Sequence, residues 1–156
     1  MTQAHDREVL SLADAVHDLL EECRMVLPGV QALFGFQLIA VFNDGFAAHL
    51  TRAEQGLHLI ALTAVAVAGA LIMTPAAYHR QTGPREATGR FLILGGRLLL
   101  GSLVPLMIGV GLDVYLIARI ILGTPASAAV LALLLLACFA HCWFVWPRLA
   151  VAKGAR

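Results

Sequence analysis

Long apolar runs separated by short polar stretches dominate this chain. The longest, residues 91–122, is interrupted only by the charged side chains of Arg97, Asp113 and Arg119. A helix needs roughly 20 apolar residues to cross a hydrocarbon core about 30 Å thick, so this run can span a membrane. Further runs satisfy the same condition at about residues 27–46, 56–77 and 125–146. The pattern predicts four spanning helices in a single membrane domain, residues 1–156.

Residues 8–25 precede these runs and show a helical pattern of their own. Apolar residues recur there at alternating intervals of three and four, at Val9, Leu12, Val16, Leu19, Cys23 and Val26. The acidic residues lie outside this seam, whereas helices that rest on anionic lipid carry Lys and Arg. We therefore expect an amphipathic helix, separated from the first span at Pro28 and Gly29, that packs on its own bundle or on another subunit. The simpler alternative is a helix whose acidic face is solvated and whose apolar face is small.

Short local motifs mark where helices begin and end. Thr51 and Glu54 form a capping box at the start of the second span. Gly123 is a natural helix stop, Thr124 a natural N-cap, and Pro125 fits the first helical position. The third and fourth spans are therefore expected to join in a tight hairpin.

Asp113 is the sharpest candidate for chemistry inside the membrane. If Leu122 lies at the membrane surface, Asp113 is nine residues deeper, which is roughly 13 Å along the helix. An ionisable group at that depth is costly and usually faces the bundle interior or water, so it could be a proton- or cation-coupling site. A structural carboxyl paired with a neighbouring helix is the simpler alternative. A helix break near Gly109 and Gly111 would instead leave Asp113 in water, although an uninterrupted helix is favoured.

Four further residues in the spans have expected roles at helix contacts or at the membrane surface. Gln31 and Gln37 are expected to hydrogen-bond to a neighbouring helix, with pore lining as the alternative. Trp143 and Trp146 are expected to form an aromatic belt at the interface, and Pro147 to end the last helix.

Two arginines are expected to anchor the third span. Arg97 and Arg119 lie near its opposite ends, where a long cationic side chain can reach the headgroups. Arg119 is on the same side as the first loop, so it could reach a carboxylate there, such as Asp44 or Glu54.

Metal and enzyme chemistry have little support. Cys138, His141 and Cys142 share one helical face and are residue types that bind zinc or haem, but no second cluster accompanies them. We expect no metal and no cofactor, with the thiols packing as small apolar groups. The sequence also lacks a nucleophile–base pair, a glycine-rich phosphate loop and paired carboxylates, so it predicts a protein that is not an enzyme.

Composition supports the membrane interpretation. Hydrophobic residues make up 60% of the chain and charged residues 13%, with a mean hydropathy of +0.82, whereas soluble domains are typically about 25% charged. The net charge of +1 leaves no electrostatic footprint for nucleic acid. Most basic residues lie in the loop at 79–90 and the tail after 147, so the positive-inside rule predicts that both termini are cytoplasmic.

Two stretches carry a resemblance to a known family. They are residues 21–36, with EECR and LPGVQALFGF, and residues 75–80, with PAAYHR. The chain resembles a family of small bacterial four-span membrane proteins of unknown function, some of whose members carry an automatic sodium:proton antiporter label. The resemblance covers about residues 8–150. It implies the four-span architecture and the acidic leading helix, and it implies a bacterial inner membrane, but it supplies no established catalytic or transport residues.

Together these observations predict an all-α integral membrane four-helix bundle with an N-terminal cytoplasmic amphipathic helix. The leading functional hypothesis is a non-enzymatic subunit, either of a homo-oligomer or of a larger membrane complex in the lipid bilayer. The alternative is a proton- or cation-coupled transporter or antiporter that uses Asp113.

Overall fold

The structure, a computed structural model, describes residues 11–82 and 89–154. Within these residues the chain is helical except for short connections between the helices, and it has no strand. The elements are α1 (Leu12–Val41), α2 (Asp44–His49), α3 (Arg52–Thr82), α4 (Gly89–Leu122), α5 (Pro125–Ala140), the π-helical turn η1 (His141–Val145) and α6 (Trp146–Gly154). Four helices are long and apolar enough to cross a membrane, namely α1, α3, α4 and the rod formed by α5, η1 and α6. The all-α prediction with four membrane-compatible helices is confirmed.

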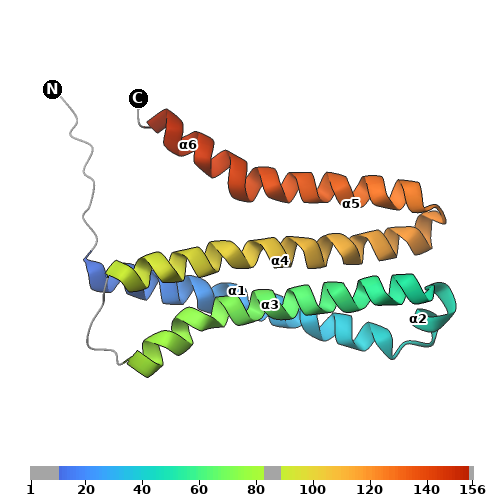
Figure 1. Cartoon of the computed structure of the whole chain (residues 1–156), viewed down its shortest axis with the longest axis horizontal. Helices are drawn as coiled ribbons and strands as arrows, with labels where there is room; N and C mark the ends of the chain where they lie inside the picture. Colours follow the sequence, from blue (N-terminus) through green and yellow to red (C-terminus); the bar gives the residue numbers. More distant parts are fainter. Residues whose placement is uncertain (1–10, 83–88, 155–156) are drawn as a thin grey trace.

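The helices α1, α3 and α4 form the packed core of the molecule. Cys23 and Val30 of α1 meet Val65 and Ile72 of α3, with side chains of α4 packed against them. Helix α5 packs along α4, on the side away from α3 (Figure 1). The predicted four-helix bundle is therefore a three-helix core with a fourth helix on its outer side.

Small residues bring α3 and α4 close together. Ala61, Val65 and Ala68 are fully buried. A Cβ atom on Gly109 would lie 2.6 Å from Cγ2 of Val65 and 3.0 Å from the backbone oxygen of Ala61, so only glycine fits there. Large apolar side chains point outward instead, and Phe36, for example, is 72% exposed. This distribution is typical of helices that pack through small residues and are solvated by lipid tails.

The separate amphipathic helix predicted for residues 8–25 is not present as such. Helix α1 runs without interruption from Leu12 to Val41 and contains Pro28 in its interior. Proline removes one backbone donor, but an apolar helix tolerates this loss when neighbouring helices hold it in place. The buried residues of α1 are Val16, Cys23, Val30 and Gln37. Of the predicted seam, Val16 and Cys23 therefore pack on the chain's own helices, whereas Leu12 and Val26 are exposed. The first predicted residue of the seam, Val9, lies outside the described residues.

The first span also ends earlier than predicted. Helix α1 stops at Val41, and the side chain of Asn43 caps a new short helix, α2, by accepting a hydrogen bond of 3.0 Å from the Gly45 amide. The chain between the first two spans is thus partly helical. Its remaining part leads directly into α3.

Three further helix ends that local motifs predicted can be compared with the structure. Thr51 and Glu54 form the capping box through hydrogen bonds of 2.8 Å and 3.3 Å. Helix α4 is continuous to Leu122, and Gly123 has a φ of +72°, which favours glycine at the hairpin. The prediction that Pro147 ends the last helix is wrong, because Pro147 lies inside α6. The wide π-helical turn η1 directly before it relieves the clash that a proline ring makes with the preceding turn.

Candidate functional site: a carboxyl–imidazole pair held by three helices

Asp113 meets one polar side chain from each of the other two core helices. Its Oδ2 accepts a hydrogen bond of 2.5 Å from Nε2 of Gln37 on α1. Its Oδ1 lies 3.5 Å from Nδ1 of His58 on α3. The other ring nitrogen of His58, Nε2, lies 3.0 Å from the backbone oxygen of Gln37. The three residues therefore form a closed set of contacts between α1, α3 and α4.

Each of these residues extends a packed seam. Gln37 continues the buried positions of α1 one heptad after Val30, and it is only 4% exposed. His58 lies three residues before the buried Ala61 of α3, and Asp113 lies four residues after Gly109 of α4. Because residues three, four and seven apart share a helical face, the packing of apolar seams brings the polar groups together.

A hollow of about 270 Å³ lies beside this cluster. Its walls are apolar side chains of α1, α2 and α4, and among the described residues that line it only Gln37, His58 and Asp113 are polar. The ring of Phe46, from α2, lies edge-on to the His58 ring at a centroid distance of 5.2 Å. Helix α2 thus covers the end of the site, while exposed side chains such as Ile117 form its outer wall.

The geometry makes the Asp113–His58 pair a site for one proton. The backbone oxygen of Gln37 can only accept a hydrogen bond, so Nε2 of His58 must carry a hydrogen. In neutral His58 the lone pair is then on Nδ1, which faces Oδ1 of Asp113. A favourable contact needs one proton between these atoms, on either the carboxyl or the imidazole. Loss of that proton would leave a lone pair facing a carboxylate.

Gln37 also offers an acceptor that the protein does not use. Its Oε1 is buried and has no hydrogen-bond partner within residues 11–82 and 89–154. A buried polar atom without a partner is rare and calls for an explanation. Amide and carboxylate oxygens are also the ligands that hard cations prefer, so Oε1 and the Asp113 carboxylate together could contact a small cation. The polar atoms of the cluster are thus of the chemical types that bind a proton or a small cation.

The remaining candidates lie away from this cluster. Gln31 and Arg97 are exposed, whereas Gln37 makes the interhelical hydrogen bond expected of a glutamine in a span. Arg119 makes the expected contact with the first connection, because its Nε lies 3.4 Å from Oε1 of Glu54. It also donates a hydrogen bond of 2.8 Å to the backbone oxygen of Gly123.

The aromatic and thiol residues of the last span lie on its surface. Trp143 is half-buried and stacks on Phe139 at a centroid distance of 4.6 Å, while Trp146 is 65% exposed. Cys138 and Cys142 are exposed free thiols. Among the residues that the structure describes, no group of three or more His, Cys, Asp or Glu side chains could hold a metal ion.

His58 is the site residue that the sequence pattern alone did not single out. Its position near the end of the second span suggests an interfacial residue. The usable signal is its spacing, because it begins the series of buried positions that continues through Ala61 and Val65.

The comparisons with known proteins place the chain in a family and leave the activity open. No curated protein and no solved structure matches the chain. The profile of a family of unknown function, DUF6328, matches residues 6–147, a segment that contains Gln37, His58 and Asp113. Because this match covers most of the sequence, the chain belongs to that family of unknown function.

Proposed function

We propose that this protein is a non-enzymatic membrane protein that binds and releases a proton, or a small cation in its place, at Asp113 during coupled transport. The observation that carries the proposal is the Asp113–His58 contact of 3.5 Å, in which His58 is also fixed by the backbone oxygen of Gln37. A purely structural carboxyl needs donors only. Asp113 instead faces an imidazole that can either give or take the proton.

The position of the pair fits proton exchange with one side of the membrane. Gln37 lies four residues before the end of α1, roughly 6 Å along the helix, and His58 lies six residues after the start of α3, roughly 9 Å along it. Asp113 lies nine residues, roughly 13 Å, before the end of α4, so the site is inside the bundle but closer to the end that α2 covers. A movement of α2 that displaces Phe46 from His58 would open it to water on that side.

The test is proton flux into proteoliposomes that carry a trapped pH indicator, driven by a potassium diffusion potential. Asp113→Asn keeps the size and hydrogen-bonding capacity of the side chain but removes its charge. We expect wild-type flux to be abolished in this variant. Asp44→Asn is the matched control, because Asp44 is an exposed carboxylate on α2 at the same end of the molecule.

A second readout separates binding from transport. Infrared difference spectra between acidic and alkaline buffer should show a carboxyl band in the wild type and in Asp44→Asn that Asp113→Asn lacks. Wild-type protein without flux, or Asp113→Asn with unchanged flux, would contradict the transport proposal. Identical infrared spectra for wild type and Asp113→Asn would contradict proton binding itself.

We also propose that the protein works as a homo-oligomer or as a subunit of a membrane complex. The supporting observation is the arrangement of α5, which packs along α4 and leaves an apolar hollow of about 260 Å³ beside α1. Val30, Leu33, Leu106 and Trp143 are among its lining residues. Mass measurement of the particle in a mild detergent tests this proposal. We expect at least a dimer or a stable co-purifying subunit, and a strictly monomeric particle would contradict it.

The same charge pattern that predicts cytoplasmic termini supports a proposed orientation in a bacterial inner membrane. The start of α1, the end of α3 and the C-terminal end of the chain lie at one end of the molecule (Figure 1). Arg80 and Arg148 belong to this end, so it is proposed to face the cytoplasm. A C-terminal fluorescent-protein fusion should be bright and a C-terminal alkaline phosphatase fusion inactive. The reverse result would invert the orientation.

A further inference from the structure

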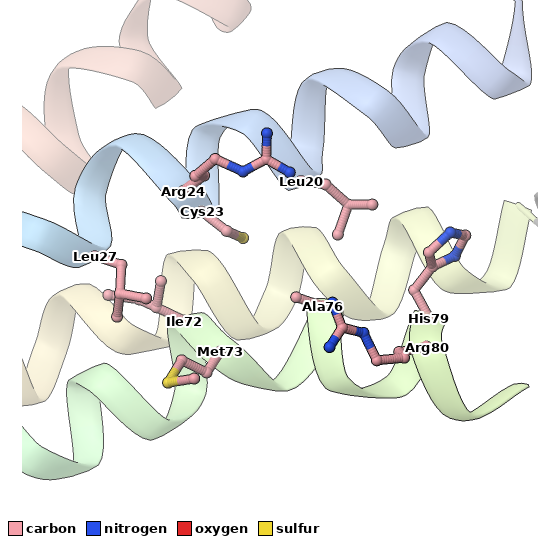
Figure 2. A pocket seen from close by; sticks show the side chains of 9 residues that line it. All are labelled: Leu20, Cys23, Arg24, Leu27, Ile72, Met73, Ala76, His79 and Arg80. Carbon is pink, nitrogen blue, oxygen red and sulfur yellow. The ribbon is translucent and has the colours of Figure 1, made fainter. Parts of the chain in front are cut away.

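A second hollow, of about 510 Å³, lies between α1 and α3 at the end of the molecule opposite Asp113. Its floor is apolar and includes Leu20, Leu27 and Ile72. Its cationic part comes from two arginines, Arg24 on α1 and Arg80 on α3, with His79 beside the latter (Figure 2). We call this hollow the basic groove.

The two arginines reach into the basic groove from opposite directions. A helical side chain leans toward the N-terminus of its own helix. Because α1 and α3 are antiparallel, Arg24 leans toward the level of Leu20 while Arg80 leans toward the level of Ala76. Figure 2 shows the Arg24 side chain lying along α1 and the Arg80 side chain lying along α3, both at the groove and extending in opposite directions along it. One apolar channel is therefore bordered by two cationic side chains, one from each helix.

The chain supplies no counter-charge for these arginines in the part that the structure describes. Neither Arg24 nor Arg80 makes an ion pair there, and Glu21, one turn before Arg24, lies 3.4 Å from His17 instead. Two positive charges that line one hollow repel each other, and an anion held there would offset this repulsion. The guanidinium fork matches a phosphate group geometrically, and Arg is the preferred residue for that contact.

The depth of the basic groove is that of lipid headgroups. Arg24 lies 17 residues before Val41, the last residue of α1, which corresponds to roughly 26 Å along the helix. A hydrocarbon core is about 30 Å thick, so Arg24 reaches one interface when the end of α1 lies near the other. The apolar floor continues from there toward the membrane interior, where an acyl chain would lie.

We propose that the basic groove is a binding site for an anionic phospholipid. The phosphate lies between Arg24 and Arg80, and one acyl chain packs along Leu27 and Ile72. A headgroup with net negative charge is preferred over a zwitterionic one, because the groove carries two arginines and no carboxylate of the described residues pairs with them. A water-soluble phosphate would use the arginines but not the floor, so the tail is required for tight binding.

The test is native mass spectrometry of the detergent-purified full chain with added phosphatidylglycerol, phosphatidylcholine or water-soluble glycerol phosphate. Retained phosphatidylglycerol should exceed retained phosphatidylcholine, and glycerol phosphate should not be retained. Arg24→Gln and Arg80→Gln should each weaken phosphatidylglycerol binding about tenfold, since each removes a charge-assisted hydrogen bond. Arg97→Gln is the control, because Arg97 is an exposed cation on α4 that does not line the groove.

A second variant tests the apolar floor without changing any charge. Ala76→Trp places an indole in the groove, where Ala76 is exposed, and should displace the lipid while the fold is retained, as circular dichroism would show. Equal retention of both lipids would overturn the proposal. So would an Arg97→Gln loss as large as that of Arg24→Gln, or unchanged binding by Ala76→Trp.

Discussion

The polar groups of the two hollows differ in whether the protein itself supplies their partners. Beside Asp113, each polar side chain contacts a polar group of a neighbouring helix, although Oε1 of Gln37 has no partner among the described residues, and α2 covers the cluster. In the basic groove, Arg24 and Arg80 project over apolar side chains without a carboxylate from the described chain. A polar group inside the bundle needs a protein partner because lipid tails offer none, whereas a group at the interface can take its partner from headgroups or water.

The difference is also visible in where these residues lie on their helices. Gln37 and His58 occupy the buried seams and are 4% and 7% exposed. Arg24 directly follows the seam residue Cys23 and is exposed. A substitution of a buried residue between the helices should therefore affect the Asp113 cluster more than the basic groove. A substitution of an exposed residue should affect the basic groove more.

The largest expected effect comes from Gly109→Val. The added side chain would overlap Val65 and the backbone of Ala61, one turn from Asp113. Overpacking of this kind typically destabilises by about 1–3 kcal/mol, so the melting temperature in detergent should fall. The Asp113 infrared band should also change, while phosphatidylglycerol binding at the distant basic groove is retained.

The control for that change is Gly101→Val. A Cβ atom at Gly101 meets nothing within 4 Å, so the same substitution adds volume without overlap. Equal melting temperatures for Gly101→Val and Gly109→Val would mean that the close α3–α4 contact does not hold the site together.

Sequence could predict the elements whose causes are local. The apolar runs, the capping box at Thr51 and Glu54, and the stop at Gly123 each depend on residues close together in the chain, and the structure has all of them. The uninterrupted α4 also agrees with the sequence prediction, because Gly109 and Gly111 lower helix propensity without removing a hydrogen bond. Pro105 does remove one, but it is accommodated inside the helix, as Pro28 is in α1. Asp113 stood out because a charge in an apolar run is conspicuous.

The partners of Asp113 depended on how the helices align, which local motifs do not determine. His58 is level with Asp113 only because Gly109 seats α4 closely against Ala61 and Val65. The prediction that Pro28 separates two helices also obscured a regular spacing. The buried residues Val16, Cys23, Val30 and Gln37 follow one another at intervals of seven along one continuous helix. Both Pro28 and Pro147 led to a wrong predicted boundary. Neighbouring helices hold α1 together at Pro28, and a π-helical turn accommodates Pro147.

A smaller effect is expected when the two hollows are compared by double-mutant cycles. His58→Gln and Asp113→Asn should show a coupling free energy of about 0.5–3 kcal/mol, since the residues share one buried contact. Arg24→Gln and Arg80→Gln should show little coupling, or a coupling of opposite sign, because no protein contact joins them. Unfolding in mixed detergent micelles measures both. Equal couplings in the two cycles would remove the distinction between a protein-paired cluster and a lipid-facing groove.

The smallest effect is expected for Arg119 and Glu54, which pair at the α2 end but outside the Asp113 hollow. The Arg119 side chain is 32% exposed, so water and salt weaken its contact of 3.4 Å with Glu54. Glu54→Gln is the clean variant, because glutamine preserves the capping box while it removes the charge. Its cycle with Arg119→Gln should give a small fraction of the His58–Asp113 coupling, and added salt should reduce it further. The contrary result would be a coupling that does not depend on salt and is as large as that of His58 and Asp113. Strong pairing would then extend to the surface of the protein. In that case, depth would no longer explain which polar groups find their partners within the protein.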